Sequence, residues 1–257
     1  MTLRFFILEL GVFMERCDYV NDNLRLIQDT EGLTFGTDAL LLAGYVNGKY
    51  KRGLELGSGS GIISMLLITR GKVENVTALE VQSHYAELTQ RNAELNGLEG
   101  KLECVCTDLR DYKPSLEYDL IYTNPPYMKV DSGKSNITEK KNIARHEVNG
   151  DIFDFCKSAR RMLKFGGNFV AVYRTDRLID LIEAMRQSRI EPKRMTLVYA
   201  DTDSEPSMAL IEGKAGGKGG LLLTKPLIIY RDKAHKEYTD DLNYIMENGS
   251  FPSDYKR

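Results

Sequence analysis

Apolar and polar positions along the chain follow two alternating periods. Short runs dense in branched and aromatic residues predict strands, and longer stretches with apolar residues three or four positions apart predict helices. The predicted strands cover 24–27, 53–56, 75–80, 102–107, 118–123, 168–173, 194–199 and 221–230, the last divided by Pro226. The predicted helices cover 37–45, 62–70, 84–96, 153–163 and 177–188, with Thr37 or Asp38 as the N-cap of the first.

This alternation predicts an α/β fold, in which helices cover both faces of a doubly wound, mostly parallel sheet. The strand patterns 194–199 and 221–230 follow one another without a clear helix between them, so we expect an antiparallel hairpin at the sheet edge. The glycine-rich stretch 213–220 fits the flexible loop of that hairpin, and its two lysines could contact phosphate. Residues 128–149 are polar and basic and predict a loop.

The length of 257 residues fits one domain with small extensions. We expect the main domain over 35–232, an N-terminal extension over 1–34 and a C-terminal tail over 233–257. The apolar run in 1–13 is interrupted by Glu9, and Met14 is a plausible start, so 1–13 are expected to be an upstream artefact or a loosely attached segment. No apolar run reaches the roughly 18 residues that a membrane span needs.

Cysteine usage bears on the compartment and on metal binding. The four cysteines show neither zinc spacing nor a disulfide framework. We therefore expect a cytoplasmic protein with reduced thiols and no bound metal. Its oligomeric state is not encoded in these patterns, and a monomer is the default. The histidines at 84, 146 and 235 are assigned no role.

Charge is distributed unevenly, although the net charge is only −2. Between Lys157 and Arg194 there are ten Lys or Arg residues against four Asp or Glu residues, an excess of six. This segment either faces phosphate groups or forms ordinary solvated helix faces.

A glycine-rich turn joins the predicted strand 53–56 to the helix that follows it. Glycines at 57, 59 and 61 permit positive φ and let a ligand lie against the main chain, at the edge where doubly wound sheets bind ligands. Glu80 ends the next strand, where a carboxylate can accept the hydroxyl protons of a ribose, and Asp108 follows the third strand, where it can accept an adenine amine. A nicotinamide dinucleotide would suit the spacing too, but its fingerprint wants glycine at 62, which is Ile.

The most discriminating motif is Asn124-Pro125-Pro126-Tyr127, directly after the strand 118–123. The prolines fix the backbone and remove N–H donors, so carbonyl oxygens are left as acceptors. A planar amino group could donate one N–H to the Asn124 side chain and the other to the Pro125 carbonyl, while Tyr127 stacks on its plane. Methyl transfer to such a nitrogen needs alignment more than a strong base. We therefore expect the catalytic residues to be Asn124, Pro125, Pro126 and Tyr127.

From about residue 20 to residue 230 the chain resembles the class I S-adenosylmethionine-dependent amino-methyltransferases, and among them most the bacterial tRNA1(Val) (adenine-N6)-methyltransferases. The segments that carry the resemblance are 35–42, 54–61, 124–127 and 144–147. It implies a seven-stranded sheet with an antiparallel last strand, and it places Thr37 and Asp38 near the methionine end of the cofactor. The expected S-adenosylmethionine contacts are Thr37, Asp38, Glu55, Gly57, Gly59, Gly61, Glu80, Asp108 and Asn124.

The resemblance indicates the reaction type better than the substrate. Asn-Pro-Pro-Tyr also occurs in protein-glutamine and ribosomal RNA guanine methyltransferases, and a non-catalytic RNA- or nucleotide-binding module is a further alternative. The chain has too little before residue 37 for the helical domain usual in the glutamine enzymes, which favours tRNA. The residues expected to contact RNA are Lys129, Lys134, Lys140, Lys141 and Arg145.

Overall fold

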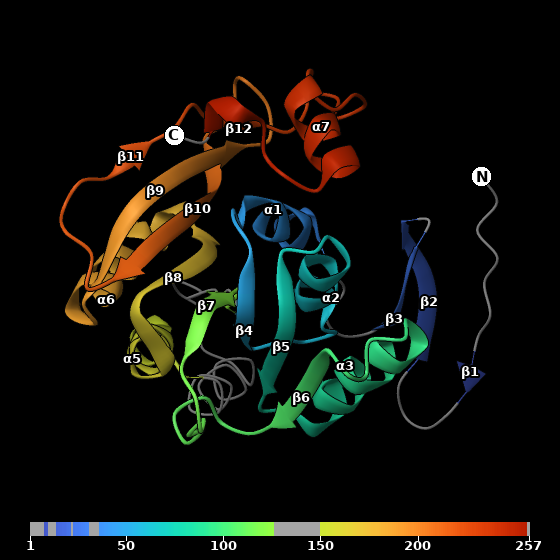
Figure 1. Cartoon of the computed structure of the whole chain (residues 1–257). Coiled ribbons are helices and arrows are strands. Elements are labelled where there is room, and N and C mark those ends of the chain that lie inside the picture. Colours follow the sequence, from blue (N-terminus) through green and yellow to red (C-terminus); the bar gives the residue numbers. More distant parts are fainter. Residues whose placement is uncertain (1–7, 10–13, 22, 31–35, 126–149, 256–257) are drawn as a thin grey trace, which may run out of the picture.

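The computed structural model describes residues 8–9, 14–21, 23–30, 36–125 and 150–255. Its centre is a nine-stranded sheet in the order β11-β9-β10-β8-β7-β4-β5-β6, with β12 also paired to β9 (Figure 1). The strands are β4 (Tyr50–Leu56), β5 (Val73–Glu80), β6 (Leu102–Cys106), β7 (Tyr118–Thr123), β8 (Leu163–Arg174), β9 (Ile190–Tyr199), β10 (Pro206–Ala215), β11 (Leu222–Leu223) and β12 (Leu227–Ile228). If the two-residue strands β11 and β12 are left out, the sheet has the seven strands that we expect.

Parallel pairing dominates this sheet, which confirms the predicted fold class. Strands β6, β5, β4, β7 and β8 run parallel, and β10 runs antiparallel to both β8 and β9. The predicted edge hairpin between 194–199 and 221–230 was wrong, because these strands are not antiparallel partners. The antiparallel partner of β9 is β10, whereas β11 and β12 pair with β9 in parallel.

The sequence pattern does not predict strand β10, because the strand begins at a proline and ends inside the glycine-rich stretch for which we expect a loop. Gly213, Lys214 and Ala215 belong to this strand, with Gly213 and Lys214 paired on both sides and Ala215 paired with β9. Glycine is needed at 213 because a Cβ there would lie 2.4 Å from Met185 Cε and 2.8 Å from Ile190 Cγ2. The glycine thus serves close packing of β10 rather than a flexible turn.

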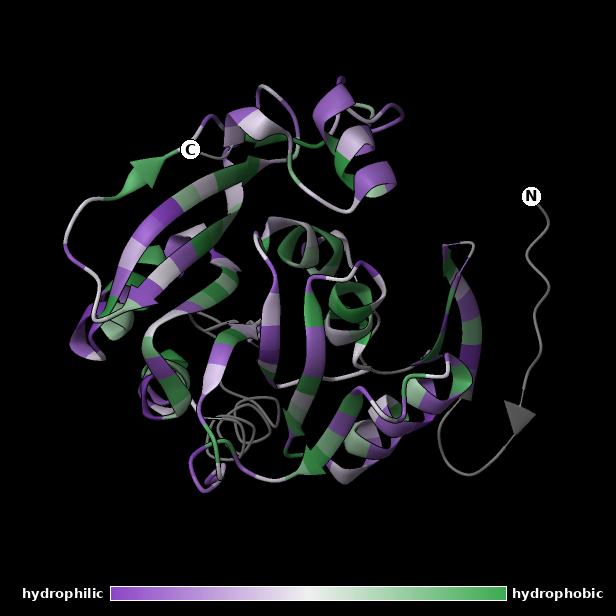
Figure 2. Ribbon diagram, viewed as in Figure 1, coloured by the Kyte–Doolittle hydropathy of each residue, from purple (hydrophilic) through white to green (hydrophobic). Residues whose placement is uncertain are grey.

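Helices cover both faces of the sheet: α1 (Thr37–Tyr45), α2 (Ile62–Thr69), α3 (Ser83–Leu95), α5 (Ile152–Met162), α6 (Leu178–Gln187) and α7 (Asp240–Asn248). Helices α1, α2, α3 and α7 contribute to one buried apolar cluster, and α5 and α6 contribute to another. Neighbouring strand residues point to opposite clusters, for example Leu120 and Ile121 in β7. Figure 2 shows hydrophobic and hydrophilic residues as bands of colour along the strands. The sheet therefore has a core on each face.

The segment before α1 forms a separate three-stranded sheet of β1 (Leu8–Glu9), β2 (Met14–Asn21) and β3 (Leu24–Asp29). It lies beside α3, apart from the central sheet (Figure 1). Asn92 joins α3 to β3, because its side-chain amide accepts from the Ile27 N–H at 2.7 Å and donates to the Ile27 carbonyl at 3.0 Å. The domain boundaries at 34 and 232 stay predictions, but Leu242 and Ile245 of α7 lie in the same buried cluster as α1.

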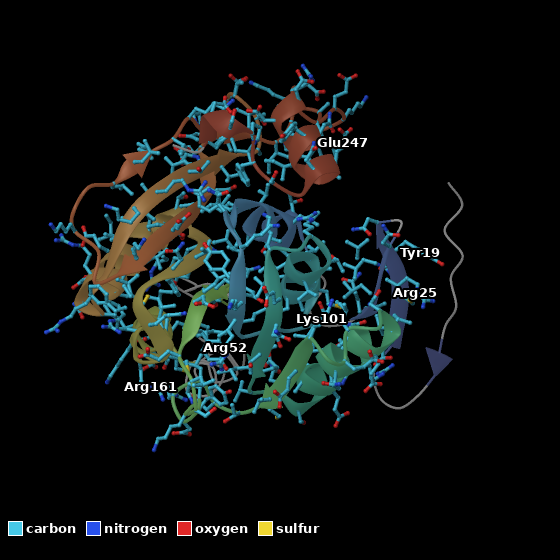
Figure 3. The ribbon with its side chains drawn as sticks, viewed as in Figure 1. Tyr19, Arg25, Arg52, Lys101, Arg161 and Glu247 are labelled. Atoms are coloured by element: carbon cyan, nitrogen blue, oxygen red, sulfur yellow. The ribbon has the colours of Figure 1, made fainter. Side chains whose placement is uncertain are left out.

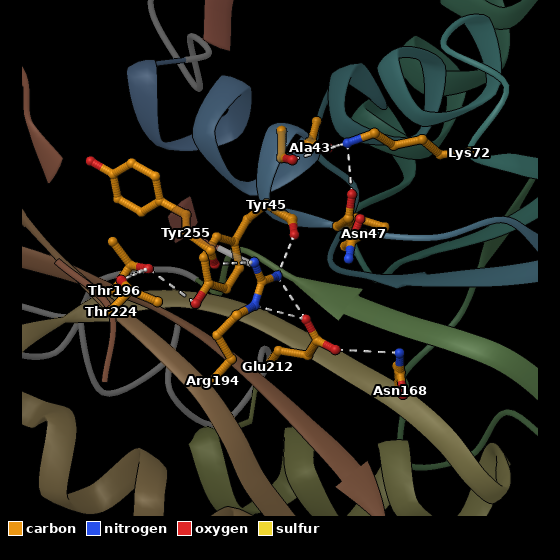
Figure 4. Close-up of polar contacts among 12 residues, drawn as sticks. Ala43, Tyr45, Asn47, Lys72, Asn168, Arg194, Thr196, Glu212, Thr224 and Tyr255 are labelled. Carbon is orange, nitrogen blue, oxygen red and sulfur yellow. Dashed lines mark hydrogen bonds and ion pairs between the residues drawn. The ribbon is translucent and has the colours of Figure 1, made fainter. Parts of the chain in front are cut away.

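Arg194 shows that part of the basic segment 157–194 is used inside the fold. Its guanidinium is buried, pairs with Glu212 at 2.7 Å and donates to the carbonyls of Tyr45 and Tyr255 (Figure 4). It also lies over the Tyr45 ring, 3.8 Å from the centroid. The prediction of a phosphate-facing role is therefore wrong for Arg194, which ties α1, β9, β10 and the segment after α7 together.

Other basic residues of this segment also have partners within the protein. The Arg161 guanidinium of α5 (labelled in Figure 3) donates to the carbonyls of Leu109, Arg110 and Tyr112. Several more pair with nearby carboxylates, namely Lys164 with Asp119, Arg174 with Asp176, Arg177 with Asp180 and Arg186 with Glu191. The acids at 176, 180 and 191 already belong to the segment, so of these partners only Asp119 and Glu212 bring negative charge from outside it and offset two of the six excess positive charges.

In the described ranges, no helix is long and apolar enough to cross a membrane. The same ranges contain no group of three or more His, Cys, Asp or Glu side chains that could hold a metal ion. The four cysteines are free thiols.

Candidate active site

Several of the predicted site residues that the structure describes lie at one edge of the central sheet. Strands β5, β4 and β7 are parallel neighbours with β6 next to β5, so their carboxyl ends share that edge. The glycine turn follows β4, Glu80 ends β5, Asp108 follows β6 and Asn124 follows β7. The Thr123 hydroxyl donates to the Leu56 carbonyl at 2.8 Å and ties the ends of β7 and β4 together.

The glycine turn has the backbone that its sequence predicts. Gly57, Gly59 and Gly61 have φ of 75°, 56° and 79°, a region that side chains rarely adopt. Helix α3 supports the turn from behind, since the Thr89 hydroxyl donates to the Gly59 carbonyl at 2.9 Å and the Asn92 amide donates to the Ser60 carbonyl at 3.0 Å. The main chain of the turn is therefore held rigidly.

Glu80 is joined directly to the glycine turn. Its buried carboxylate accepts from the Gly59 N–H and from the Gln82 N–H, both at 3.0 Å. A carboxylate has about four acceptor positions on its two oxygens, so two backbone bonds fix its orientation and leave acceptor capacity. This geometry fits the predicted contact with two ribose hydroxyls, a contact that stays a prediction.

Glu55 lies beneath the turn and is completely buried. It accepts from the Ser64 hydroxyl, which lies 2.6 Å from the Tyr122 hydroxyl, while its Oε1 atom has no hydrogen-bond partner among the described residues. Burial raises the pKa of Glu55 to about 8, so the carboxyl holds its proton at neutral pH. The carboxyl of Glu55 therefore belongs to the core. A contact between Glu55 and the cofactor stays a prediction.

Asp108 is paired with a residue that the sequence analysis did not consider. The Arg110 side chain reaches both carboxylate oxygens of Asp108, with its Nε 2.9 Å from Oδ1 and its terminal nitrogen 2.5 Å from Oδ2. The same guanidinium holds the pKa of Asp108 below its ordinary value. The predicted bond from an adenine amine to Asp108 must share this carboxylate with Arg110.

Asn124 and Asp38 come together from positions far apart in the sequence. The Asn124 amide nitrogen donates to Asp38 Oδ2 at 2.8 Å, and Asp38 Oδ1 accepts from the Ala39 N–H at 2.9 Å. The predicted N-cap of α1 was wrong: Gly36 occupies that position and no side chain caps the helix. The reason is that Thr37 is already helical and Asp38 uses its second oxygen for Asn124.

Part of the predicted site lies outside the residues that the structure describes. This holds for Pro126 and Tyr127 of the motif and for all five predicted RNA contacts, Lys129, Lys134, Lys140, Lys141 and Arg145. Pro125 is described and is buried.

The residues that sequence reasoning missed are supporting ones, namely Ser64, Thr89, Asn92, Arg110 and Tyr122. Thr89 and Asn92 gave a faint signal, because polar residues three positions apart on a helix share one face. Here that face is buried rather than solvated. Arg110 gave a second signal, since it follows Asp108 by two positions in a loop.

Comparison with known proteins extends this picture. The sequence profile of the family described as "Methyltransferase small domain" matches residues 30–188. The protein named tRNA1(Val) (adenine(37)-N6)-methyltransferase in Parabacteroides distasonis is 30% identical over 187 residues, which are 72% of this chain and 78% of that protein. A protein of the same name from a Flavobacteriaceae bacterium is 24% identical over 87% of this chain and 93% of its own length.

Solved structures share the fold. A predicted O-methyltransferase from Agrobacterium tumefaciens matches with a TM-score of 0.68 at 21% identity, over 84% of this chain and 98% of its own. TYW2 of P. horikoshii, solved in complex with MeSAdo, matches with a TM-score of 0.56 at 15% identity, over 81% of this chain and 74% of its own. The profile covers more than half of the chain and agrees with this fold, and the chain therefore belongs to the methyltransferase small-domain family of S-adenosylmethionine-dependent enzymes.

Proposed function

We propose that this methyltransferase transfers a methyl group from S-adenosylmethionine to the exocyclic amine of an adenine in tRNA, in the anticodon loop of valine tRNA, and that it works in the cytoplasm. The observation that carries the proposal is Asn124, which is held by Asp38 at the same sheet edge as the glycine turn. The relatives named tRNA1(Val) (adenine(37)-N6)-methyltransferase support adenine in tRNA as the acceptor.

The residues present fit S-adenosylmethionine. The three positive-φ glycines form a turn without side chains, and the neighbouring Glu80 carboxylate is oriented by backbone donors. In the proposed site these residues hold the ribose and the main body of the cofactor, Asp108 accepts its adenine amine, and Thr37 and Asp38 lie near its methionine end. When bound, the cofactor supplies a methyl group on a positively charged sulfur.

The role of the chain's own residues is to align and polarise the target amine. The side-chain oxygen of Asn124 accepts one N–H of the adenine amine, and the carbonyl of Pro125 accepts the other. Both acceptors favour the positive charge that develops on the nitrogen, which releases its proton after the new bond has formed. Alignment of the lone pair with the methyl carbon supplies most of the rate acceleration, on the order of 7–11 kcal/mol at best.

The RNA must present its adenine outside the base stack. Single-stranded loops allow this at a cost of a few kcal/mol, which suits an anticodon loop. We propose that Tyr127 stacks on the extruded base and that Lys129, Lys134, Lys140, Lys141 and Arg145 contact phosphates.

The test uses the full chain with radiolabelled S-adenosylmethionine and three acceptors in parallel: total tRNA, ribosomal RNA and a release factor. Products are digested to nucleosides or amino acids and separated. We expect label in N6-methyladenosine from tRNA, and less label from tRNA transcripts that lack the valine anticodon loop. Label in methylglutamine or N2-methylguanosine instead would contradict the proposed substrate, and no transfer to any of the three would favour a non-catalytic module.

A further inference from the structure

The hydrogen bond between Asp38 and Asn124 has only one possible direction. An ionised carboxylate has acceptors and no donor, so the Asn124 amide must turn its NH₂ group toward Asp38 Oδ2, 2.8 Å away. In a planar amide the carbonyl oxygen then points to the other side. The bond thus selects one of the two orientations that an asparagine side chain can adopt about its last torsion.

The Asp38 carboxylate has a second hydrogen-bond partner besides Asn124. Its Oδ1 atom accepts from the Ala39 N–H at 2.9 Å, in the first turn of α1, where the helix dipole favours a negative charge. Gly36 leaves the space for this arrangement, since a Cβ at that position would lie 2.8 Å from Oδ1. The bond to Asn124 is therefore made by a preorganised acceptor.

We propose that Asp38 is a positioning residue that sets the orientation of the Asn124 amide, so that its oxygen rather than its nitrogen meets the target amine. The inference rests on the proposed function of Asn124 as an acceptor, and it goes beyond the cofactor contact expected for Asp38. A reversed amide would face the NH₂ of the substrate with its own NH₂ and would repel it.

Three variants test this role. Asp38→Asn keeps the shape but can either donate or accept, so both orientations of Asn124 become available. Asp38→Glu keeps an acceptor-only group on a longer arm. Gly36→Ala keeps the charge but displaces Oδ1. Asp180→Asn is the matched control, because it makes the same charge change in the first turn of α6 on the other sheet face.

The measurement is the single-turnover rate with saturating cofactor, which separates positioning from cofactor affinity. A charged hydrogen bond corresponds to about a 10- to 100-fold change in rate. We expect Asp38→Asn and Gly36→Ala to lose rate by about this factor, Asp38→Glu to retain more rate than Asp38→Asn, and Asp180→Asn to match the wild type. Thermal unfolding of each variant verifies that it is folded.

A double-mutant cycle gives the decisive readout. If Asp38 acts through Asn124, then Asp38→Asn has no further effect in the Asn124→Ala background. Multiplied effects, or an unchanged saturated rate in Asp38→Asn alone, would overturn the inference. The assay of the wild-type protein tests the proposed substrate separately. If the wild type methylates another acceptor but not tRNA, the proposed substrate is wrong, and the same variants are then measured on that acceptor to test the role of Asp38.

Discussion

At the scale of single residues, the proposed chemistry depends on Asn124. In the proposed site its amide oxygen is one of two acceptors for the target amine, so Asn124→Ala would remove an interaction that strengthens as charge develops. We expect a loss of about 100-fold or more in turnover. Cofactor affinity, measured by calorimetry, should stay within about threefold. A large loss of affinity instead would show that the acceptor role has been assigned to the wrong residue.

Gly61 combines two constraints, a φ of 79° and a contact with Thr89, whose Cγ2 would lie 2.8 Å from an added Cβ. Gly61→Ala should therefore lower the free energy of unfolding by about 2 kcal/mol or more and weaken cofactor binding. Gly71→Ala is the control, since Gly71 has a φ of 64° and open space around it. Gly71→Ala should lower the free energy of unfolding, measured with urea, by about 1 kcal/mol. Thr89→Ser, which removes the clashing methyl group, should partly rescue Gly61→Ala.

Glu55 makes stability depend on pH. Burial raises its pKa to about 8 from an ordinary value of 4.5, so between these values the folded state holds a proton that the unfolded state has lost. The contribution of this group therefore falls as pH rises from about 4.5 to 8. Glu55→Gln should gain stability relative to the wild type between pH 5 and pH 8 in urea titrations. Equal differences at both pH values would mean that Glu55 is ionised in the folded protein.

At the scale of elements, clear periodicity decided what the sequence could reveal. The helices α1, α2, α3, α5 and α6 and the strands β4 to β9 lie within a few residues of their predicted ranges. Helix α7 was taken for tail, although its signals were present: Thr239 as N-cap, acidic residues in the first turn and Gly249 in the left-handed conformation after its end. Strand β10 had no comparable signal, because its one glycine, Gly213, is explained only by the packing of its neighbours.

The candidate site divides in the same way. The glycine turn, Glu80 and Asn124 could be predicted because each lies at or directly after the end of a recognisable strand. The Asp38–Asn124 bond could not be predicted, since it joins residues 86 positions apart that meet only through the packing of α1 near the end of β7.

The docking of β3 on α3 leads to a prediction about Asn92. Asn92→Ala would leave the Ile27 N–H, the Ile27 carbonyl and the Ser60 carbonyl without this partner. We expect a loss of about 3 kcal/mol and faster amide exchange over 24–29. The exposed Asn75 is a suitable control. Unchanged exchange over β3 would show that the N-terminal sheet is held by other contacts.

At the scale of the whole molecule, Arg194 connects parts of the chain that are distant in sequence. Arg194→Met leaves the Glu212 carboxylate without its guanidinium. Removal of one partner of a fully buried pair costs about 3–5 kcal/mol, and because Glu212 is only partly buried we expect a loss near the lower end of this range. Arg194→Met combined with Glu212→Leu should be less damaging than the sum of the single changes. Thermal and urea unfolding measure both. Strict additivity would show that the two side chains are not energetically coupled.

The position of β10 between β8 and β9 also constrains the order in which the protein can be assembled. During synthesis, β4 to β8 leave the ribosome before β10, yet one edge of β8 is paired only when residues 208–214 arrive. The hydrogen bond from Arg194 to the Tyr255 carbonyl can form only after a further 61 residues have been synthesised. A nascent chain halted before residue 206 would expose an unpaired strand edge to other chains, which is a known route to aggregation. Folding of this enzyme is therefore expected to be mostly post-translational, even though its proposed catalytic motif lies in the first half of the sequence.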